Sequence, residues 1–73
     1  MIPAATTDTV SPTGMDLRLM RVRARLTVGQ VAQAAGWSRS RGSAIEATEY
    51  PTRRAVSRYL DALQAAATER AGS

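Results

Sequence analysis

Apolar side chains recur at helical spacing along most of the chain, and no stretch alternates apolar and polar residues as a half-buried strand would. The apolar stripe of the first expected helix comprises Leu17, Met20 and Ala24, with Leu19 and Val22 near the same face. The stripe of the last expected helix comprises Val56, Tyr59, Leu60 and Leu63. Two shorter helical stretches lie between them. The sequence therefore predicts a small all-α domain of four helices, or of five if the tail adds one.

Residues that favour helix starts and stops mark the ends of the first two elements. We expect Asp16 to cap a first helix that begins at Leu17. Thr27 and Gln30 form a T-x-x-Q capping box, which is a typical start for the second helix. That helix is expected to end at Gly36, because glycine accepts the positive φ that a helix C-terminus often requires.

The same signals bound the other two helices and the domain. Ser38 is expected to cap a helix over residues 39–46. Pro51 disfavours helix at the residue before it, and Thr52 caps a last helix that runs from residue 53 to about residue 67. We therefore expect a disordered arm at residues 1–14, a folded domain at residues 15–67 and a frayed tail at residues 68–73.

Charge adds a functional indication to this helical pattern. All ten basic residues are Arg, and the formal net charge is +4. Between Leu17 and Leu60, nine Arg stand against only two acids, Glu46 and Glu49, which gives this segment a charge of +7. A basic field of this density favours a polyanion as partner. A merely basic protein surface is the alternative that charge alone leaves open.

The residue types that are missing exclude several classes of function. The chain has no Cys and no His, so it lacks a disulfide framework, the usual zinc ligands and the commonest general base. The few acids are scattered singly, and we therefore predict no catalytic residues, no metal, no cofactor and no enzyme activity. No segment has the length of an apolar membrane span, and the N-terminus lacks the features of a secretory signal. We expect a cytoplasmic, nucleoid-associated protein without membrane contact.

The segment TVGQVAQAAGWSRSRGSAIE, residues 27–46, places two short helices on either side of a glycine, which is a helix-turn-helix arrangement. From about residue 16 to residue 63 the chain resembles the λ repressor/Cro-type helix-turn-helix DNA-binding domain, also called the xenobiotic-response-element family. The family pattern appears as DLRLMR, LTVGQVAQAAGWSRS, IE and YPTRRAVSRYLDAL, in that order. The resemblance implies a λ repressor-like fold and double-stranded DNA as partner.

Roles for individual residues follow from this resemblance. The expected base contacts in the major groove are Arg39, Ser40, Arg41, Ser43 and Ala44. The expected phosphate contacts are Thr27, Val28, Ser38, Arg53 and Arg54. The side chains expected to hold the two helices together are Val31, Ala32, Ala35, Trp37 and Ile45. Arg21 and Glu46 match a pair that relatives use as a partly buried, structural ion pair.

Three residues depart from the family pattern. The family usually has Gln where Val28 stands, Val or Ile where Gly42 stands, and Gly where Arg25 stands. Glycine within the recognition helix lowers helix propensity and removes a packing side chain. We expect that Trp37 fills part of this space, or else that the helix is short or becomes ordered only on DNA.

The function that best fits is a sequence-specific transcriptional regulator, a repressor that binds a palindromic operator as a homodimer through the helix 38–46. The dimer surface is expected at Tyr59–Leu63 or in the alanine-rich tail. The alternative is an antitoxin or adaptor that binds a protein partner, such as a toxin or another regulator, and also autoregulates its operon. A MerR-type winged helix is disfavoured, because a helix precedes the motif and no strand pattern follows it.

Overall fold

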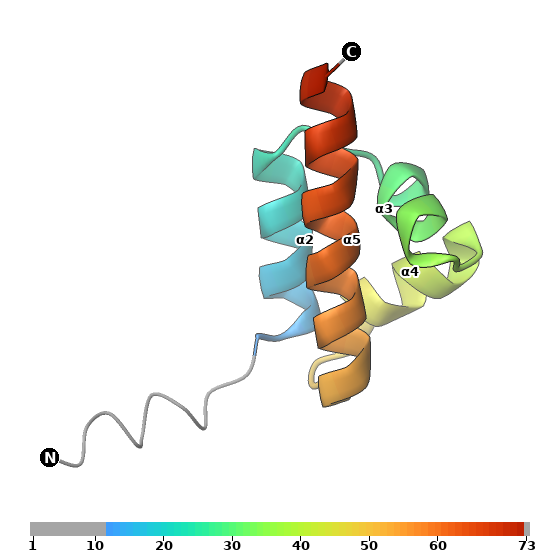
Figure 1. Cartoon of the computed structure of the whole chain (residues 1–73). Helices are drawn as coiled ribbons and strands as arrows, with labels where there is room; N and C mark the ends of the chain where they lie inside the picture. The colour runs from blue at the N-terminus through green and yellow to red at the C-terminus, as the bar shows by residue number, and fades with distance from the viewer. Residues whose placement is uncertain (1–11, 73) are drawn as a thin grey trace, which may run out of the picture.

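The computed structural model of the protein describes residues 12–72, which form four helices and no strand (Figure 1). The helices are α2 (Gly14–Arg23), α3 (Val28–Ala35), α4 (Arg39–Ala47) and α5 (Arg53–Gly72). The predicted all-α class and the four-helix count are confirmed for this part of the chain. Residues 1–11 of the expected arm lie outside the described residues.

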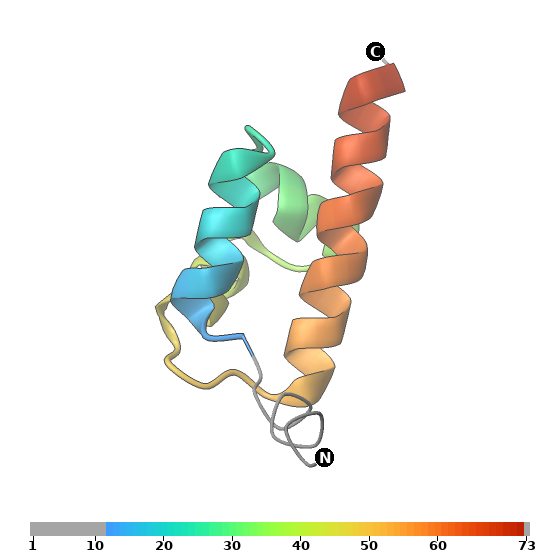
Figure 2. The same cartoon turned by 90° about the vertical axis from the view of Figure 1, so that its left-hand side faces the viewer.

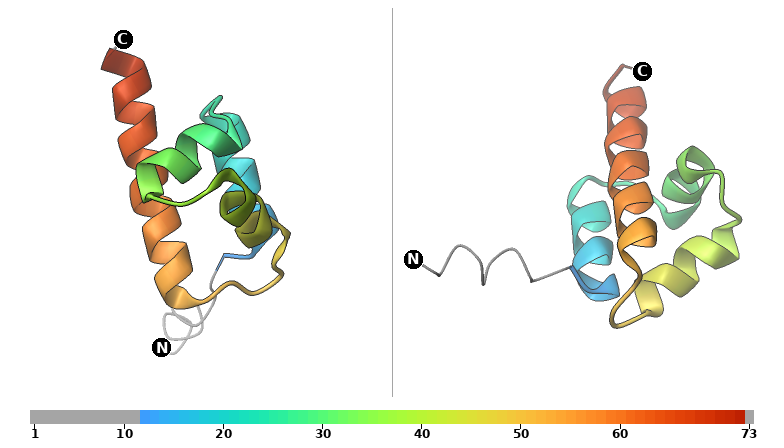
Figure 3. Two further views of the ribbon diagram at one scale, coloured as in Figure 1. Left: turned by 90° about the vertical axis from the view of Figure 1, so that its right-hand side faces the viewer. Right: turned by 60° about the horizontal axis from the view of Figure 1, so that its bottom comes forward.

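The long helix α5 organises the domain. In Figure 1 it lies between α2 on one side and the α3–α4 pair on the other, and its last turns extend beyond the other helices, as Figure 2 also shows. Helix α3 packs most extensively on α5. Seen from the opposite side, α3 leads through a short turn into α4 (Figure 3, left). This arrangement leaves one side of the α3–α4 pair away from α5.

The core is a cluster of side chains from all four helices. Its largest fully buried members are Leu17 of α2, Val31 of α3 and Tyr59 of α5. The remaining buried apolar residues are Leu26, Ala32, Ala35, Ile45, Val56, Ala62 and Ala66. Burial of a large aliphatic or aromatic side chain contributes about 1.5–3 kcal/mol, so the convergence of the three large ones stabilises the junction of α2, α3 and α5.

The predicted start of the first helix is wrong by three positions. Thr13 is the N-cap, and Asp16 is the third helical residue of a capping box. The backbone N–H of Asp16 donates to Thr13 Oγ1 at 3.1 Å, and the N–H of Thr13 donates to Asp16 Oδ2 at 3.0 Å. The folded domain therefore includes Thr13 and Gly14, which the sequence had placed in the arm.

Gly14 has a packing role at this end of α2. Its N–H donates to the carbonyl oxygen of Thr48, just beyond the end of α4, at 2.9 Å. A Cβ atom at this position would lie 2.3 Å from Thr48 O and 2.4 Å from Glu46 O. Only glycine lets the start of α2 approach the end of α4 so closely.

The other predicted caps are present. Thr27 and Gln30 form the full capping box, with reciprocal hydrogen bonds of 3.1 and 2.7 Å. Ser38 Oγ accepts the N–H of Arg41 at 3.1 Å, and Thr52 Oγ1 accepts the N–H of Ala55 at 3.1 Å. Each cap provides a partner for a backbone donor that has none within its helix. Helices α3, α4 and α5 therefore begin where the sequence predicts.

The predicted apolar face of the first helix is only partly right, because Leu17 and Ala24 contribute to the core but Met20 does not. Leu17 is fully buried, but Met20, Leu19 and Val22 are 38%, 48% and 52% exposed. The inward face of α2 instead includes Arg21, whose side chain is only 15% exposed. A polar residue takes this position because carboxylate and carbonyl partners satisfy its guanidinium there.

Three expectations for the last helix are also corrected. Leu60 is 36% exposed, whereas Ala62 and Ala66 are buried, so the packed face of α5 follows the small residues. Tyr59 is fully buried and is therefore not available as part of a dimer surface. Helix α5 continues to Gly72 rather than ending near residue 67.

Arg70 explains part of this extension of α5. Its Nη1 donates to the carbonyl oxygens of Arg25 at 3.0 Å and Ala24 at 3.3 Å, which belong to the turn after α2. Arg25 has φ 61° and is the one non-glycine residue among residues 12–72 with positive φ. The backbone conformation explains why glycine is usual at this position in the family.

Although α5 spans 20 residues, no helix in the described part of the chain is apolar enough over a sufficient length to cross a membrane.

Candidate nucleic-acid interface

The turn between α3 and α4 has the geometry that its sequence predicts. Gly36 closes α3 with φ 77° and ψ 25°, in the left-handed region. The N–H of Trp37 donates back to the carbonyl oxygen of Ala32 at 2.8 Å. Ser38 then caps α4, so only three residues separate the two helices. A short turn of this kind fixes the direction of α4 relative to α3.

Helices α3 and α4 pack closely at Gly42. This residue is buried, and a Cβ atom on it would lie 3.2 Å from Ala32 Cβ and 3.3 Å from Val28 Cγ2. The space expected to be filled by Trp37 is therefore filled by Val28 and Ala32. Helix α4 is continuous through Gly42, so the expectation of a shortened recognition helix is wrong. The two departures from the family pattern, Val28 and Gly42, therefore lie side by side, with the larger residue at position 28 next to the smaller one at position 42.

The predicted base-contacting residues all lie on α4 with exposed side chains. They are Arg39, Ser40, Arg41, Ser43 and Ala44. Gly42, which lies between them in sequence, and Ile45, which follows them, are buried and attach the helix to the core. We call the exposed surface formed by Arg39, Ser40, Ser43 and Ala44 the outer face of α4. It presents one positive charge, two hydroxyls and a methyl group, which are the groups that recognise base edges.

The predicted phosphate-contacting residues are distributed over three helix starts. Thr27 and Ser38 are N-caps of α3 and α4, and Arg53 and Arg54 begin α5 with exposed side chains. Val28 is half-buried against Gly42, so it offers its backbone rather than its side chain to a ligand. A helix start provides backbone N–H groups and a positive dipole end, which suit an anion.

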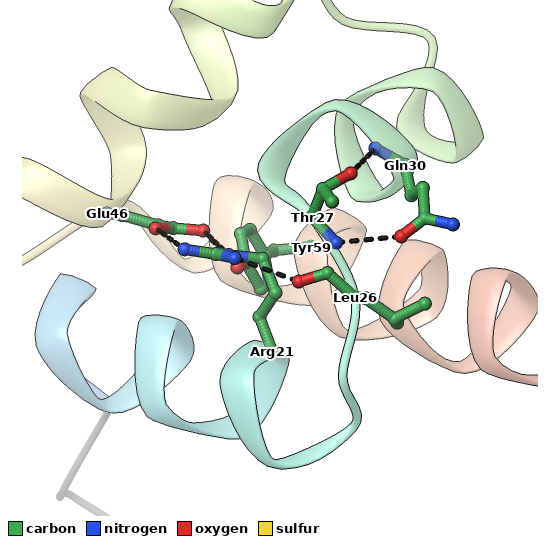
Figure 4. A network of polar contacts seen from close by, with 6 residues as sticks. All are labelled: Arg21, Leu26, Thr27, Gln30, Glu46 and Tyr59. Atoms are coloured by element: carbon green, nitrogen blue, oxygen red, sulfur yellow. Dashed lines mark hydrogen bonds and ion pairs between the residues drawn. The ribbon is translucent and has the colours of Figure 1, made fainter.

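A polar network anchors the C-terminal part of α4 (Figure 4). Arg21 donates from Nε to Glu46 Oε2 at 2.7 Å and from Nη2 to Glu46 Oε1 at 3.1 Å. Its Nη1 donates to the carbonyl oxygen of Leu26 at 2.9 Å. The expected ion pair is thus present in a bidentate geometry, with side chains only 15% and 8% exposed.

Tyr59 completes this network, and the sequence analysis missed its polar role. Its hydroxyl donates to Glu46 Oε2, while its ring lies in the core. The sequence did contain a signal for this role, because a Tyr within an apolar helix stripe is expected to be buried and a buried phenol needs a hydrogen-bond partner. Glu46 therefore joins α2, α4 and α5 through its one carboxylate.

The network also shifts the ionisation of its members. Burial acts to raise the pKa of Glu46, but the hydrogen bonds from Arg21 and Tyr59 and the charge of Arg21 outweigh it, so this pKa lies below its usual value. Burial and the hydrogen bond to Glu46 raise the pKa of Tyr59, which keeps the phenol protonated as a donor. The hydrogen bond to Glu46 raises the pKa of Arg21 against the opposing effect of burial. At neutral pH the carboxylate is ionised and all its partners donate to it.

A second cluster surrounds Trp37, which is half-buried against the core. The guanidinium carbon of Arg41 lies 5.7 Å from the centroid of the Trp37 ring, a cation–π distance. Arg58 donates from Nε to the carbonyl oxygen of Ala35 at 2.9 Å, near the end of α3. The sequence analysis assigned no role to Arg58. No sequence signal would have paired it with a residue 23 positions away.

Among the residues that the structure describes, no group of His, Cys, Asp or Glu gathers in a way that could hold a metal ion. The candidate site is a basic, hydroxyl-bearing surface supported by a buried polar network.

In comparisons with known proteins, a family model described as a helix-turn-helix domain matches residues 14–72. No curated protein and no solved structure gives a significant match to the chain.

Proposed function

The chain belongs to the helix-turn-helix domain family, and from this premise we propose that it is a sequence-specific DNA-binding transcriptional regulator. The observation that carries the proposal is the outer face of α4. Its four side chains are exposed on a helix whose opposite side is fixed to the core by Ile45 and Glu46. Such a helix fits the major groove of B-form DNA, which is about 12 Å wide.

Arg39 is the central residue of this proposal. It is the first residue of α4, and the N-terminal residues of a recognition helix point toward the base edges. A bidentate contact from Arg39 to guanine provides about 1–3 kcal/mol of discrimination. Ser40 and Ser43 contact bases or phosphates, and Ala44 contacts a thymine methyl group. The family resemblance also assigns Arg41 to the base contacts.

Phosphate contacts orient α4 in the groove. In the proposed complex they come from Thr27, Val28, Ser38, Arg53 and Arg54. Val28 makes its contact through its backbone N–H at the start of α3, whereas Thr27 uses its hydroxyl hydrogen, because the Thr27 N–H already donates to Gln30 Oε1. Arg53 and Arg54 make theirs through their guanidinium groups. These contacts add affinity without sequence preference, and they make binding sensitive to salt.

The regulator is proposed to act as a homodimeric repressor on a palindromic operator. A dimer places two copies of α4 about 34–36 Å apart, which matches successive major-groove faces on one side of the duplex. Occupation of such an operator blocks access to a promoter. Tyr59 itself is buried, so we propose this contact on the exposed parts of α5, either around Leu60 or along its alanine-rich end. For a protein that binds DNA without catalysis, we propose a location in the cytoplasm with the nucleoid.

The test is a selection of bound duplexes from a random-sequence pool, followed by affinity measurements on the enriched duplex and a scrambled duplex. Wild type is compared with Arg39→Ala and with Arg23→Ala, a control that removes an exposed Arg at the end of α2. We expect Arg39→Ala to lose about 1–3 kcal/mol of preference for the enriched duplex, and Arg23→Ala to retain it. Equal binding of all duplexes by wild type would contradict the proposal. Absence of any DNA binding would instead favour the protein-binding alternative.

A further inference from the structure

Arg41 does not share the outer face of α4. At about 100° per residue, the four residues of that face fall within an arc of about 140°, and Arg41 lies about 60° beyond Ala44. Arg39 lies at the other edge of the exposed surface of α4, about 160° from Arg41. The two arginine side chains therefore leave the helix in different directions.

Trp37 holds Arg41 in this direction. The guanidinium carbon lies 5.7 Å from the ring centroid, and the ring is itself fixed by packing against the core. A cation–π contact at a partly exposed site contributes about 0.5–1 kcal/mol. Redirecting Arg41 toward a base edge would break this contact, whereas a ligand beside Trp37 would leave it in place.

Beside Trp37 the surface contains a pocket of about 180 Å³. The residues lining it are Trp37, Arg41, Thr52, Arg54, Ala55 and Arg58. Three guanidinium groups from two helices thus face one small space, and no carboxylate is among the lining residues. By contrast, the neighbouring hollow along α5 includes Asp61.

The position of Arg58 in this pocket is fixed from behind. Its Nε donates to the carbonyl oxygen of Ala35 at 2.9 Å, which leaves the terminal nitrogens as further donors. Three like charges around one space repel one another, and an anion between them removes that repulsion. Guanidinium groups match phosphate oxygens in planar, paired geometry. The chemistry of the lining therefore fits a phosphate group.

We infer that the pocket formed by Trp37, Arg41, Arg54 and Arg58 binds one phosphate of the DNA backbone, so that Arg41 anchors the duplex and Arg39 alone among the α4 arginines recognises a base. The inference rests on the proposed DNA-binding function and refines it. It separates two arginines that are only two positions apart in sequence. It also gives Arg58 a role in DNA binding, because α5 then contributes to the same phosphate contact as α4.

The test compares Arg41→Ala with Arg39→Ala on the enriched and scrambled duplexes over a range of salt concentrations. Arg41→Ala is expected to weaken binding to both duplexes by the same factor. The slope of log affinity against log salt concentration is negative, and its magnitude should be smaller for Arg41→Ala by about 0.9, the value for one lost phosphate contact. Arg39→Ala is expected to reduce the ratio of the two affinities. A reduced ratio for Arg41→Ala, or an unchanged salt slope, would overturn the inference.

Single methylphosphonate substitutions, each removing the charge of one phosphate, identify the contact directly. One such substitution should weaken binding by wild type and have a smaller effect on Arg41→Ala and on Arg54→Ala, because each variant lacks one of the guanidinium groups that bind this phosphate. Arg23→Ala, the matched control, should keep the full sensitivity at that position. If the three variants all keep that sensitivity, the pocket does not bind a phosphate.

The two proposals fail in different ways. If selection enriches no sequence, the regulator function is wrong, but the salt slopes of Arg41→Ala and Arg23→Ala can still be compared on random-sequence duplex. A lower slope for Arg41→Ala alone would support the phosphate pocket even then. Equal slopes for these two variants would overturn it, whatever the sequence preference of wild type.

Discussion

The two ends of α4 differ in how they are held. At the N-terminal end, Arg39 and Ser40 are exposed, and one hydrogen bond from the Arg41 N–H to Ser38 caps the helix. At the C-terminal end, Ile45 is buried and Glu46 accepts hydrogen bonds from two other helices. The same nine-residue helix therefore has a fixed end and a presented end.

This difference separates stability from recognition. Substitutions at the fixed end disturb contacts among α2, α4 and α5, and they should lower the free energy of unfolding. Substitutions at the presented end remove little that the folded chain uses, and they should act on the DNA complex. The following predictions test that separation, from the largest expected effect to the smallest.

Glu46→Ala should have the largest effect on stability. It leaves the guanidinium of Arg21 and the hydroxyl of Tyr59 in a nearly buried space without their carboxylate. Removing one partner of a buried ion pair costs about 3–5 kcal/mol, and the slight exposure of this pair favours the lower end. Urea unfolding followed by circular dichroism at 222 nm measures the loss. Glu49→Ala, which removes an exposed acid, is the control and should change stability by less than about 0.5 kcal/mol.

Acidification should remove the same charge without a mutation. Because the pKa of Glu46 is lower in the folded protein than in the unfolded chain, its contribution is complete above the unfolded pKa and is lost as pH falls through the folded value. The stability difference between wild type and Glu46→Gln should therefore shrink as the solution is acidified below the usual carboxyl range. A difference that stays constant with pH would show that the charge of Glu46 is not what holds α4.

Gly14→Ala should be the next most destabilising change. The new methyl group would lie 2.3–2.6 Å from three carbonyl oxygens at the end of α4, and these are backbone atoms that cannot rotate away. Overpacking of this kind costs about 1–3 kcal/mol, and we expect the upper end. Gly29→Ala is the matched control, because its Cβ would meet only Thr27 Oγ1 at 3.8 Å. Thermal unfolding should show a lower midpoint for Gly14→Ala and no loss for Gly29→Ala.

Gly42→Val tests the middle of α4. Its extra methyl groups enter the space occupied by Val28 and Ala32, and we expect a loss of about 1–2 kcal/mol. The double variant Val28→Ala, Gly42→Val should recover part of this loss, because the first change removes the side chain that the second one crowds. A double-mutant cycle in urea measures the coupling. Additive effects would mean that the two positions do not compensate for one another.

Ser38→Ala should have the smallest effect of these on stability. It removes the one side-chain acceptor at the start of α4, and loss of an N-cap costs about 1 kcal/mol. Amide hydrogen exchange should show faster exchange in the first turn of α4, with protection of the last turn unchanged. Ser40→Ala is the control and should leave both unchanged. Faster exchange throughout α4 in Ser38→Ala would contradict the division between its two ends.

Much of the fold follows from local signals. The caps at Thr27, Ser38 and Thr52 and the positive φ at Gly36 depend on residues within a few positions, so the sequence predicts them. The start of α2 was missed because Thr13 and Asp16 form a T-x-x-D box, and Asp16 alone also resembles a cap. Local rules predict helix ends well, but they can favour the wrong residue where two candidate caps, here Thr13 and Asp16, lie within one turn of each other.

The inward face of α2 and the cluster at Trp37 required the tertiary structure. Periodicity assigned Met20 to the core, whereas Arg21 takes that side because Glu46, 25 positions away, satisfies its charge. The family resemblance, rather than any hydrophobic pattern, identified this ion pair. The partners of Tyr59 and Arg58 lie 13 and 23 positions away and match no pattern in the sequence. Base and phosphate contacts remain predictions for the experiments above.

The close contact of Gly42 with Val28 and Ala32 has a consequence for engineering. Replacement of α4 by the corresponding helix of a related domain requires that the new helix pack on α3. Here a transplanted helix with valine or isoleucine at position 42 would meet Val28 on the preceding helix. A successful exchange must therefore carry residue 28 with it, so the smallest transferable unit in this domain is the α3–α4 pair.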